Sequence, residues 1–158
     1  MPDNFFEKHE FSMGMFAAGI AVIMFIMFGG GMASLLVVLS MQQLLGEFTS
    51  KELVSYVGIL ELIMNFCIVV PNVLILRGKP RAAKVNQINI YFQLICYSLL
   101  SLTFEHQYKW VFLSFVIFPL LANWLMVSAK YQAFLAYHEA LRKDPIGFRR
   151  SLAKKMFE

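Results

Sequence analysis

The segment from Tyr56 to Leu76 is apolar enough to cross a bilayer, yet it carries a carboxyl group at Glu61 and an amide at Asn65, one helical turn further along. Ionisable residues in hydrocarbon are costly, so they face the interior of a helix bundle or a water-filled cavity. Two kinds of chemistry fit Glu61: a protonated carboxyl group that donates a hydrogen bond between helices, or an ionisable group on a proton or cation path. A path needs further acids, and this segment supplies only one. The pattern therefore favours the structural use.

Polar residues also occur at matching depths in the other apolar segments. Counted from the outer ends at about 1.5 Å per residue, Ser34, Asn65, Gln93 and Asn123 lie roughly 18–20 Å deep, and Glu61 lies about 6 Å nearer the outside. Interhelical hydrogen bonds between such side chains are worth about 0.6 kcal/mol on average. The sequence predicts an intramembrane polar layer that fixes the register of the helices, formed by Ser34, Glu61, Asn65, Gln93 and Asn123.

Two polar faces are expected from helical spacing. In the third apolar segment, polar side chains recur at steps of three or four residues, at Asn86, Asn89, Gln93, Tyr97 and Ser101. The second segment has its own face, formed by Gly58, Glu61, Asn65 and Asn72. Residues at these spacings share one side of a helix. We expect the two faces to meet or to line a common cavity.

No pattern of catalytic or metal-binding residues is recognisable. A zinc or haem site needs ligands that converge, but His9, His106 and His138 lie far apart and near or outside the predicted membrane surfaces. Cys67 and Cys96 fall inside apolar segments with no histidine at a plausible depth, so they are interpreted as buried thiols. The sequence therefore predicts no enzymatic activity, no metal and no cofactor. No nucleic-acid-binding module surrounds the basic residues either.

Composition places the chain in a membrane. Of its 158 residues, 59% are hydrophobic and 15% are charged, and the mean hydropathy is +0.63. Four segments are long enough to span a bilayer as helices: Phe11–Leu45, Leu53–Leu76, Ile88–Phe104 and Trp110–Val127. Short connections make neighbouring spans antiparallel. We expect an all-α integral membrane protein whose residues 1–140 form an up-down-up-down bundle of four transmembrane helices, followed by a basic tail, residues 141–158.

Basic residues predict the orientation. Only Lys51 and Lys109 fall in the two connections on one side, whereas the other twelve Lys and Arg residues fall on the opposite side. Positively charged short loops remain cytoplasmic. Both termini are therefore expected in the cytoplasm, in a membrane of the bacterial inner-membrane type.

The glycine triplet Gly29–Gly31 interrupts the first apolar run. Glycine weakens a helix but lets another backbone approach closely, so the triplet forms either a kink or a packing notch. The notch is favoured. The first run is about 50 Å long if helical throughout, so it must tilt, bend or project from a hydrocarbon core of about 30 Å.

The end of the chain is expected to be helical. The fourth span is predicted to continue past Lys130, and a further helix restarts with Asp144 as its cap and Pro145 in its first turn. This last helix is basic and amphipathic, and it can lie on anionic lipids at the cytoplasmic surface or serve only to set the topology. Its basic residues and those just before it are Arg142, Lys143, Arg149, Arg150, Lys154 and Lys155.

These features predict a non-enzymatic inner-membrane protein that works through helix–helix contacts with another membrane protein or with copies of itself. It would be an accessory or assembly subunit of a membrane complex, or an immunity-type protein. Immunity proteins against pore-forming toxins are similar in size and predicted topology, and the resemblance is one of architecture alone. The alternative is an oligomeric ion or proton channel, or a small transporter, that uses the polar face of Glu61.

Overall fold

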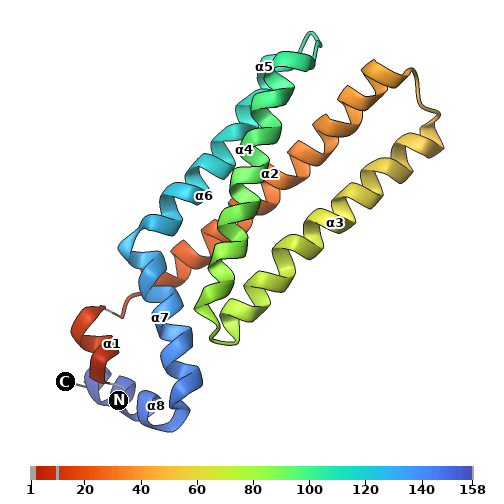
Figure 1. Ribbon diagram of the computed structural model, residues 1–158. Coiled ribbons are helices and arrows are strands. Elements are labelled where there is room, and N and C mark those ends of the chain that lie inside the picture. The colour runs from red at the N-terminus through yellow and green to blue at the C-terminus, as the bar shows by residue number, and fades with distance from the viewer. Residues whose placement is uncertain (1–2, 10, 158) are drawn as a thin grey trace.

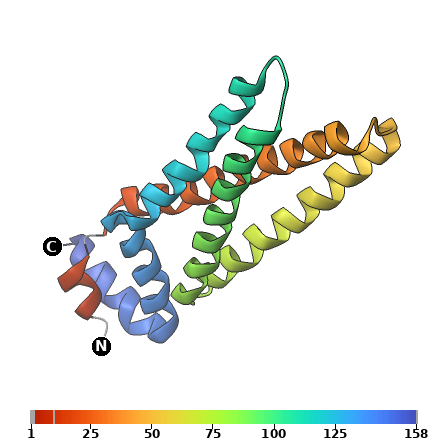
Figure 2. The same cartoon turned by 45° about the horizontal axis from the view of Figure 1, so that its top comes forward.

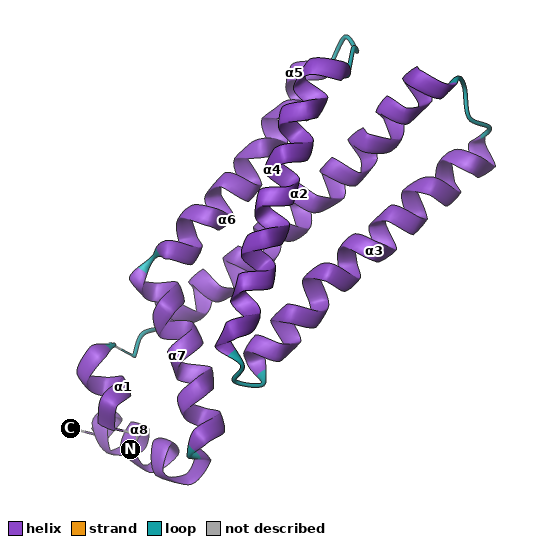
Figure 3. Ribbon diagram, viewed as in Figure 1, coloured by secondary structure: helices purple, strands orange, loops and turns teal. Residues whose placement is uncertain are grey.

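The computed structural model describes residues 3–9 and 11–157, and no strand occurs among them. The all-helical prediction is therefore confirmed for this part of the chain (Figure 3). The elements are α1 (Asp3–Lys8), α2 (Met13–Leu45), α3 (Ser50–Leu76), η1 (Pro80–Ala82), α4 (Ala83–Thr103), α5 (Lys109–Leu113), η2 (Ser114–Val116), α6 (Ile117–Val127), α7 (Ala129–Lys143) and α8 (Pro145–Phe157).

Three stretches of the described chain are long and apolar enough to cross a membrane: α2, α3 and the continuous stretch Lys109–Val127. The membrane prediction is confirmed at this level. The third predicted segment, Ile88–Phe104, lies almost wholly in α4, which has 21 residues but a less apolar sequence than the other three. Its polar residues Asn86, Asn89 and Gln93 are all buried, so the polarity of α4 is directed into the protein.

Helix α2 forms the centre of the molecule. It packs against α3, α4, α6 and α7, and α4 also packs against α3 and α6 (Figures 1 and 2). In its most apolar stretch 44% of the residues are buried, against 22% for α3 and 22% for Lys109–Val127. The helix runs without a break through Gly29–Gly31. The glycines therefore do not divide α2 into two helices.

The turns at the two ends of the bundle are fixed in different ways, by side-chain hydrogen bonds at one end and by a glycine at the other. At one end the Gln43 side chain accepts from the backbone N–H of Glu105 at 3.2 Å and donates to its carbonyl oxygen, which joins the end of α2 to the turn after α4. At the other end, Gly78 has φ +74° in the turn after α3. A Cβ atom there would lie 2.5 Å from the carbonyl oxygen of His138, so the close approach of this turn to α7 requires glycine.

The predicted continuation of the fourth span past Lys130 as one helix is wrong, because the helix breaks at Ser128. This residue has an extended backbone, with φ −64° and ψ 147°. Its Oγ accepts from the N–H of Tyr131 at 3.2 Å and donates to the carbonyl oxygen of Leu125 at 2.6 Å. One hydroxyl thus ends α6 and caps α7.

Helices α1, α7 and α8 form a terminal cap that brings the two ends of the chain together (Figures 1 and 2). Phe148 is fully buried, with its ring 5.4 Å from Phe5, 5.5 Å from Phe6 and 5.4 Å from Tyr137 between centroids. The carboxylate of Asp144 accepts from the N–H of Gly147 at 2.9 Å, at the start of α8. Phe148, the largest apolar side chain near the start of α8, is thus covered by α1 and α7 of the same chain.

Candidate functional site

A polar seam runs through the contact between α2, α3 and α4. Helix α4 supplies most of it, since its polar residues recur at helical spacing on the side that faces α2 and α3. The seam consists of Asn72, Asn86, Asn89, Gln93 and Tyr97, each between 0% and 7% exposed. The expected meeting of two polar faces is thus realised at Asn72, near the end of α3.

The amide of Gln93 links α4 to the backbone of α2. Its Nε2 donates to the carbonyl oxygen of Ile26 at 3.1 Å and to Oδ1 of Asn89 at 3.2 Å. Because a backbone carbonyl only accepts, this contact fixes the orientation of the Gln93 amide and, through it, that of Asn89. Two buried atoms remain without a protein partner, Oε1 of Gln93 and Nδ2 of Asn89.

A second amide pair joins α3 to α4 near their connecting turn. Nδ2 of Asn86 donates to Oδ1 of Asn72 at 2.8 Å, and Nδ2 of Asn72 donates to the carbonyl oxygen of Ile68 at 2.7 Å. The Asn86 side chain also lies beside the Tyr131 hydroxyl of α7. Burial raises the pKa of Tyr131, and the neighbouring Asn86 opposes part of that rise. Amide contacts therefore extend from α3 through α4 to the terminal cap.

At the glycine triplet, side chains from three helices pack close to the backbone of α2. A Cβ atom on Gly29 would lie 2.7 Å from Oε1 of Gln93 and 2.7 Å from Cδ of Pro119, and one on Gly30 would lie 2.9 Å from Cγ of Met64. The Tyr97 hydroxyl donates to the carbonyl oxygen of Gly29 at 3.0 Å. These contacts agree with the packing notch. Side chains from α3, α4 and α6 occupy the space that the missing Cβ atoms leave.

The five residues of the predicted polar layer occupy different environments. Ser34 and Gln93 are buried, Glu61 and Asn123 are half-buried, and Asn65 is exposed. The Ser34 hydroxyl donates to the carbonyl oxygen of Gly30 at 3.0 Å within its own helix, and the Glu61 carboxylate lies near Gly31, 3.4 Å from the position of an added Cβ.

Asn65 is not covered by any other helix of the described chain, although it was predicted to belong to an internal layer. Asn72 follows it by seven residues and so points in nearly the same direction from the helix axis. However, α3 and α4 converge at their connecting turn, next to α7, and diverge toward the other end (Figures 1 and 2). Asn72 is covered there and Asn65 is not.

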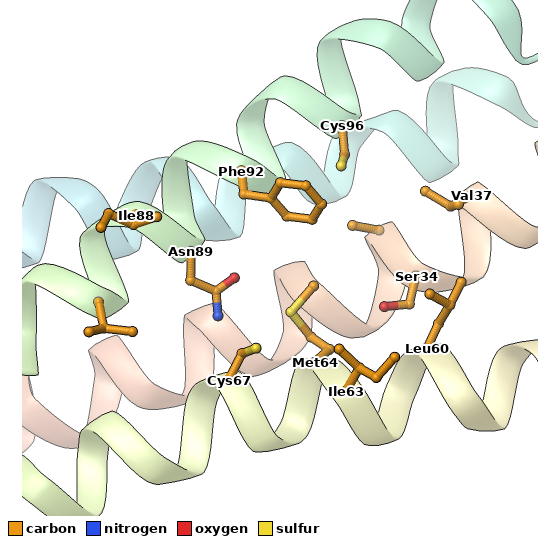
Figure 4. Close-up of a pocket in the computed structure, with 12 residues that line it drawn as sticks. Ser34, Val37, Leu60, Ile63, Met64, Cys67, Ile88, Asn89, Phe92 and Cys96 are labelled. Atoms are coloured by element: carbon orange, nitrogen blue, oxygen red, sulfur yellow. The ribbon is translucent and has the colours of Figure 1, made fainter.

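A cavity of about 370 Å³ lies between α3 and α4, with α2 as its floor (Figure 4). Its walls are largely apolar, with Phe92 and Met64 on opposite sides. Both thiols line it, Cys67 from α3 and Cys96 from α4, together with the amide of Asn89. A cavity lined by the two polar faces was one expectation from the sequence, but of those faces Asn89 alone lines this cavity, and most of its walls are apolar. The sequence signal for the observed lining was that two thiols and an amide lie in facing apolar segments.

The basic residues after Ala140 lie in and around the terminal cap. Lys143 pairs with Glu139 at 2.7 Å, and Nζ of Lys155 lies 4.9 Å from the centroid of the Phe6 ring. Arg142 packs beside Gly78. It is exposed, as are Arg149, Arg150 and Lys154. Burial lowers the pKa of His138, whose ring packs on Phe134 with a centroid distance of 4.7 Å.

Among residues 3–9 and 11–157, no three His, Cys, Asp or Glu side chains come together as a group that could hold a metal ion. No family model matches the chain, and no curated protein or solved structure matches it. The proposals below therefore rest on the geometry of this chain alone.

The notch gives a direct prediction for Gly29→Ala. The new methyl group would overlap the rigid Pro119 ring as well as Gln93, so we expect the free energy of unfolding to fall by about 1–3 kcal/mol. Gly58→Ala is the matched control, because nothing lies within 4 Å of its Cβ position. Unfolding of both variants in mixed detergent micelles should show a loss for Gly29→Ala alone. Equal stability of the two variants would contradict the close packing.

Proposed function

We propose that this chain is a non-enzymatic integral membrane protein with four transmembrane helices, and that it works by binding a transmembrane helix of another membrane protein or of a second copy. An accessory subunit, an assembly factor or an immunity-type protein would act in this way. The exposed amide of Asn65 at the middle of α3 carries the proposal.

The membrane arrangement has support beyond the three apolar stretches. Helix α4 buries three amides, those of Asn86, Asn89 and Gln93, and exposes large apolar residues on the rest of its surface, at Ile88, Phe92, Ile95, Leu99 and Leu102. An inward polar face and an outward apolar face suit a helix that crosses lipid within a bundle. The two ends of the chain lie together, as an even number of crossings requires (Figure 1).

The distribution of cations supports an orientation with both termini in the cytoplasm of a bacterial-type cell. The terminal cap and the turn between α3 and α4 hold most of the Lys and Arg residues, and they lie at the same end of the bundle (Figure 1). Such segments remain on the inner side of the membrane. Because the exposed Arg149 and Arg150 belong to this end, we propose that the cap also contacts anionic lipids.

The contact surface is proposed to lie on α3. Four of its residues at spacings of four, three and four form an outer stripe that nothing in the described chain covers, and these are Gly58, Leu62, Asn65 and Val69. This spacing places them on one face of a helix. A glycine admits the close approach of a second helix, and an amide supplies an interhelical hydrogen bond. No side chain in the described part of the chain supplies such a partner to Asn65, and hydrocarbon cannot. A second helix on the outer stripe would supply it.

The orientation predicts which introduced cysteines are accessible from outside intact cells or spheroplasts. In a chain with both native cysteines replaced by alanine, Gln107→Cys should react with a membrane-impermeant maleimide and Lys79→Cys should react only after permeabilisation. Both positions are exposed in turns at opposite ends of the bundle. The reverse pattern of labelling would place the termini outside.

The outer stripe predicts that Asn65→Leu weakens association about three- to tenfold, because one interhelical hydrogen bond is lost. The measurement is recovery of the associated chain, or of the dimer, after extraction in mild detergent. Phe66→Leu is the matched control, since Phe66 is also exposed on α3 but lies outside the stripe. If Asn65→Leu leaves association unchanged, the outer stripe is not the contact surface.

The channel or transporter alternative is favoured by one observation, the unpaired amide atoms Oδ1 of Asn86, Nδ2 of Asn89 and Oε1 of Gln93 along one interior stripe. Water in such a stripe would satisfy these atoms and provide a polar path. Glu61, half-buried beside Gly31, would be the ionisable group on it.

Substitution of Glu61 separates the two proposals. Under the contact proposal Glu61→Gln keeps assembly and activity, because glutamine retains the shape and a donor, whereas Glu61→Leu loses stability by about 1–3 kcal/mol. A proton or cation path needs an ionisable group, so both variants would abolish it. Ion flux into vesicles and thermal stability in detergent are measured on the same preparations. An intact Glu61→Gln assembly without activity would establish the alternative.

A further inference from the structure

The cavity between α3 and α4 has the size and position of a site for a lipid chain. Its volume of about 370 Å³ lies within the range of about 300–1,000 Å³ typical of ligand sites. Several lining residues face outward, among them Ile63, Ile88 and Phe92, which are 55%, 67% and 57% exposed. In a membrane the cavity therefore opens sideways to hydrocarbon.

The cavity contains an unpaired hydrogen-bond donor, the amide nitrogen of Asn89. The residue is 7% exposed and its Nδ2 has no partner, while its Oδ1 is held by Gln93. Gln93 cannot rotate its amide to change this, because its own Nε2 is held by the carbonyl oxygen of Ile26. In Figure 4 the nitrogen of Asn89 points from α4 toward Cys67 on α3. The site therefore requires an acceptor oxygen.

The turn that connects the two walls of the cavity is basic. Its cations and the one at the start of α4 are Arg77, Lys79, Arg81 and Lys84. All four are exposed, and no ion pair in the described part of the chain involves them. Lys84 precedes Ile88, a lining residue, by one helical turn. One end of an apolar cavity thus adjoins a cluster of positive charge.

We propose that the cavity binds one acyl chain of an anionic glycerophospholipid from the leaflet on the terminal-cap side. The phosphate group lies at the basic turn, an ester carbonyl accepts from Nδ2 of Asn89, and the acyl chain runs along Phe92 to Cys96. Asn89 lies about 9 Å along the helix from Ala83, and Cys96 about 10 Å beyond Asn89. A phospholipid carries the matching groups in the same order along its length: a charged phosphate, an ester carbonyl that accepts a hydrogen bond, and a hydrocarbon chain.

A second transmembrane helix fits the cavity less well. Its backbone carbonyls are engaged in its own hydrogen bonds, so it offers few acceptors to Asn89. It also carries no phosphate for the basic turn. The lipid site depends on the four-span arrangement proposed above, but it lies on the opposite flank of α3 from the outer stripe and does not depend on it.

The test uses the full chain in phosphatidylcholine vesicles that contain a minor fraction of phosphatidylglycerol with a photoreactive diazirine in its acyl chain. After irradiation, mass spectrometry should locate the crosslinks on cavity residues of α3 and α4. Asn89→Leu should lower this labelling about three- to tenfold, the equivalent of one hydrogen bond. Asn65→Leu is the control and should leave it unchanged. Replacing Arg81 and Lys84 by Gln should reduce labelling to the level obtained with photoreactive phosphatidylcholine.

A second variant keeps the test decisive if Asn89→Leu fails to fold. Cys67 is exposed and lines the cavity without joining the polar seam, so Cys67→Trp should fill the space and abolish labelling while α4 remains intact. Even labelling of all lipid-facing helices, or labelling unchanged by Cys67→Trp, would overturn the site. Equal labelling by both photoreactive lipids would overturn its preference for an anionic headgroup. The two proposals can fail separately. If Asn65→Leu no longer recovers a partner but is labelled normally by the lipid, the lipid site is independent of the contact surface on α3.

Discussion

The contact between the Gln93 amide and the backbone of α2 is the interaction on which the arrangement of the helices depends. The amide reaches the carbonyl oxygen of Ile26 because Gly29, one turn later, has no side chain in the way. Pro119 of α6 packs into the same space from another side. Any side chain at Gly29 would push α4 and α6 away from α2 together. One missing Cβ atom therefore sets the position of two helices.

In a membrane such a contact, rather than the hydrophobic effect, decides which packing arrangement of the helices is the most stable. Helices in lipid gain little from burying apolar surface against each other, since hydrocarbon already surrounds them. Close backbone approach and interhelical hydrogen bonds decide how they pack. In this chain three amides of α4, those of Asn86, Asn89 and Gln93, face inward, while most of its large apolar residues face outward. Asn65 departs from this distribution, and for that reason the proposed contact surface is centred on it.

The sequence predicted the helices and the faces on which their polar residues lie better than it predicted which neighbouring helices cover those faces. Helical periodicity placed the polar residues of α4 on one face, and the structure buries Asn86, Asn89, Gln93 and Tyr97 together. Counting residues from a membrane surface gives the depth of Asn65 but not whether a neighbouring helix covers it. The break at Ser128 was missed because a serine that caps a new helix is not distinguishable from one inside a continuous helix.

The position and the apolar lining of the cavity could not be predicted from the sequence for a related reason. It exists because α3 and α4 diverge from their connecting turn, and the angle between two helices depends on contacts distributed along both. The Asn72–Asn86 pair holds them together near the turn, and α2 supports α3 along one side.

Helix α3 is consequently the long apolar helix with open surface on two flanks, the cavity on one and the outer stripe on the other. Only 22% of its most apolar stretch is buried within the chain. Because the Asn72–Asn86 hydrogen bond lies near one end of α3, it constrains the far end weakly. An acyl chain in the cavity would fill the space into which α3 could lean, and would so hold Gly58 and Asn65 at a defined angle toward the bilayer. Helix α3 would thus have a space that suits a lipid on one flank and a surface that suits a second helix on the other.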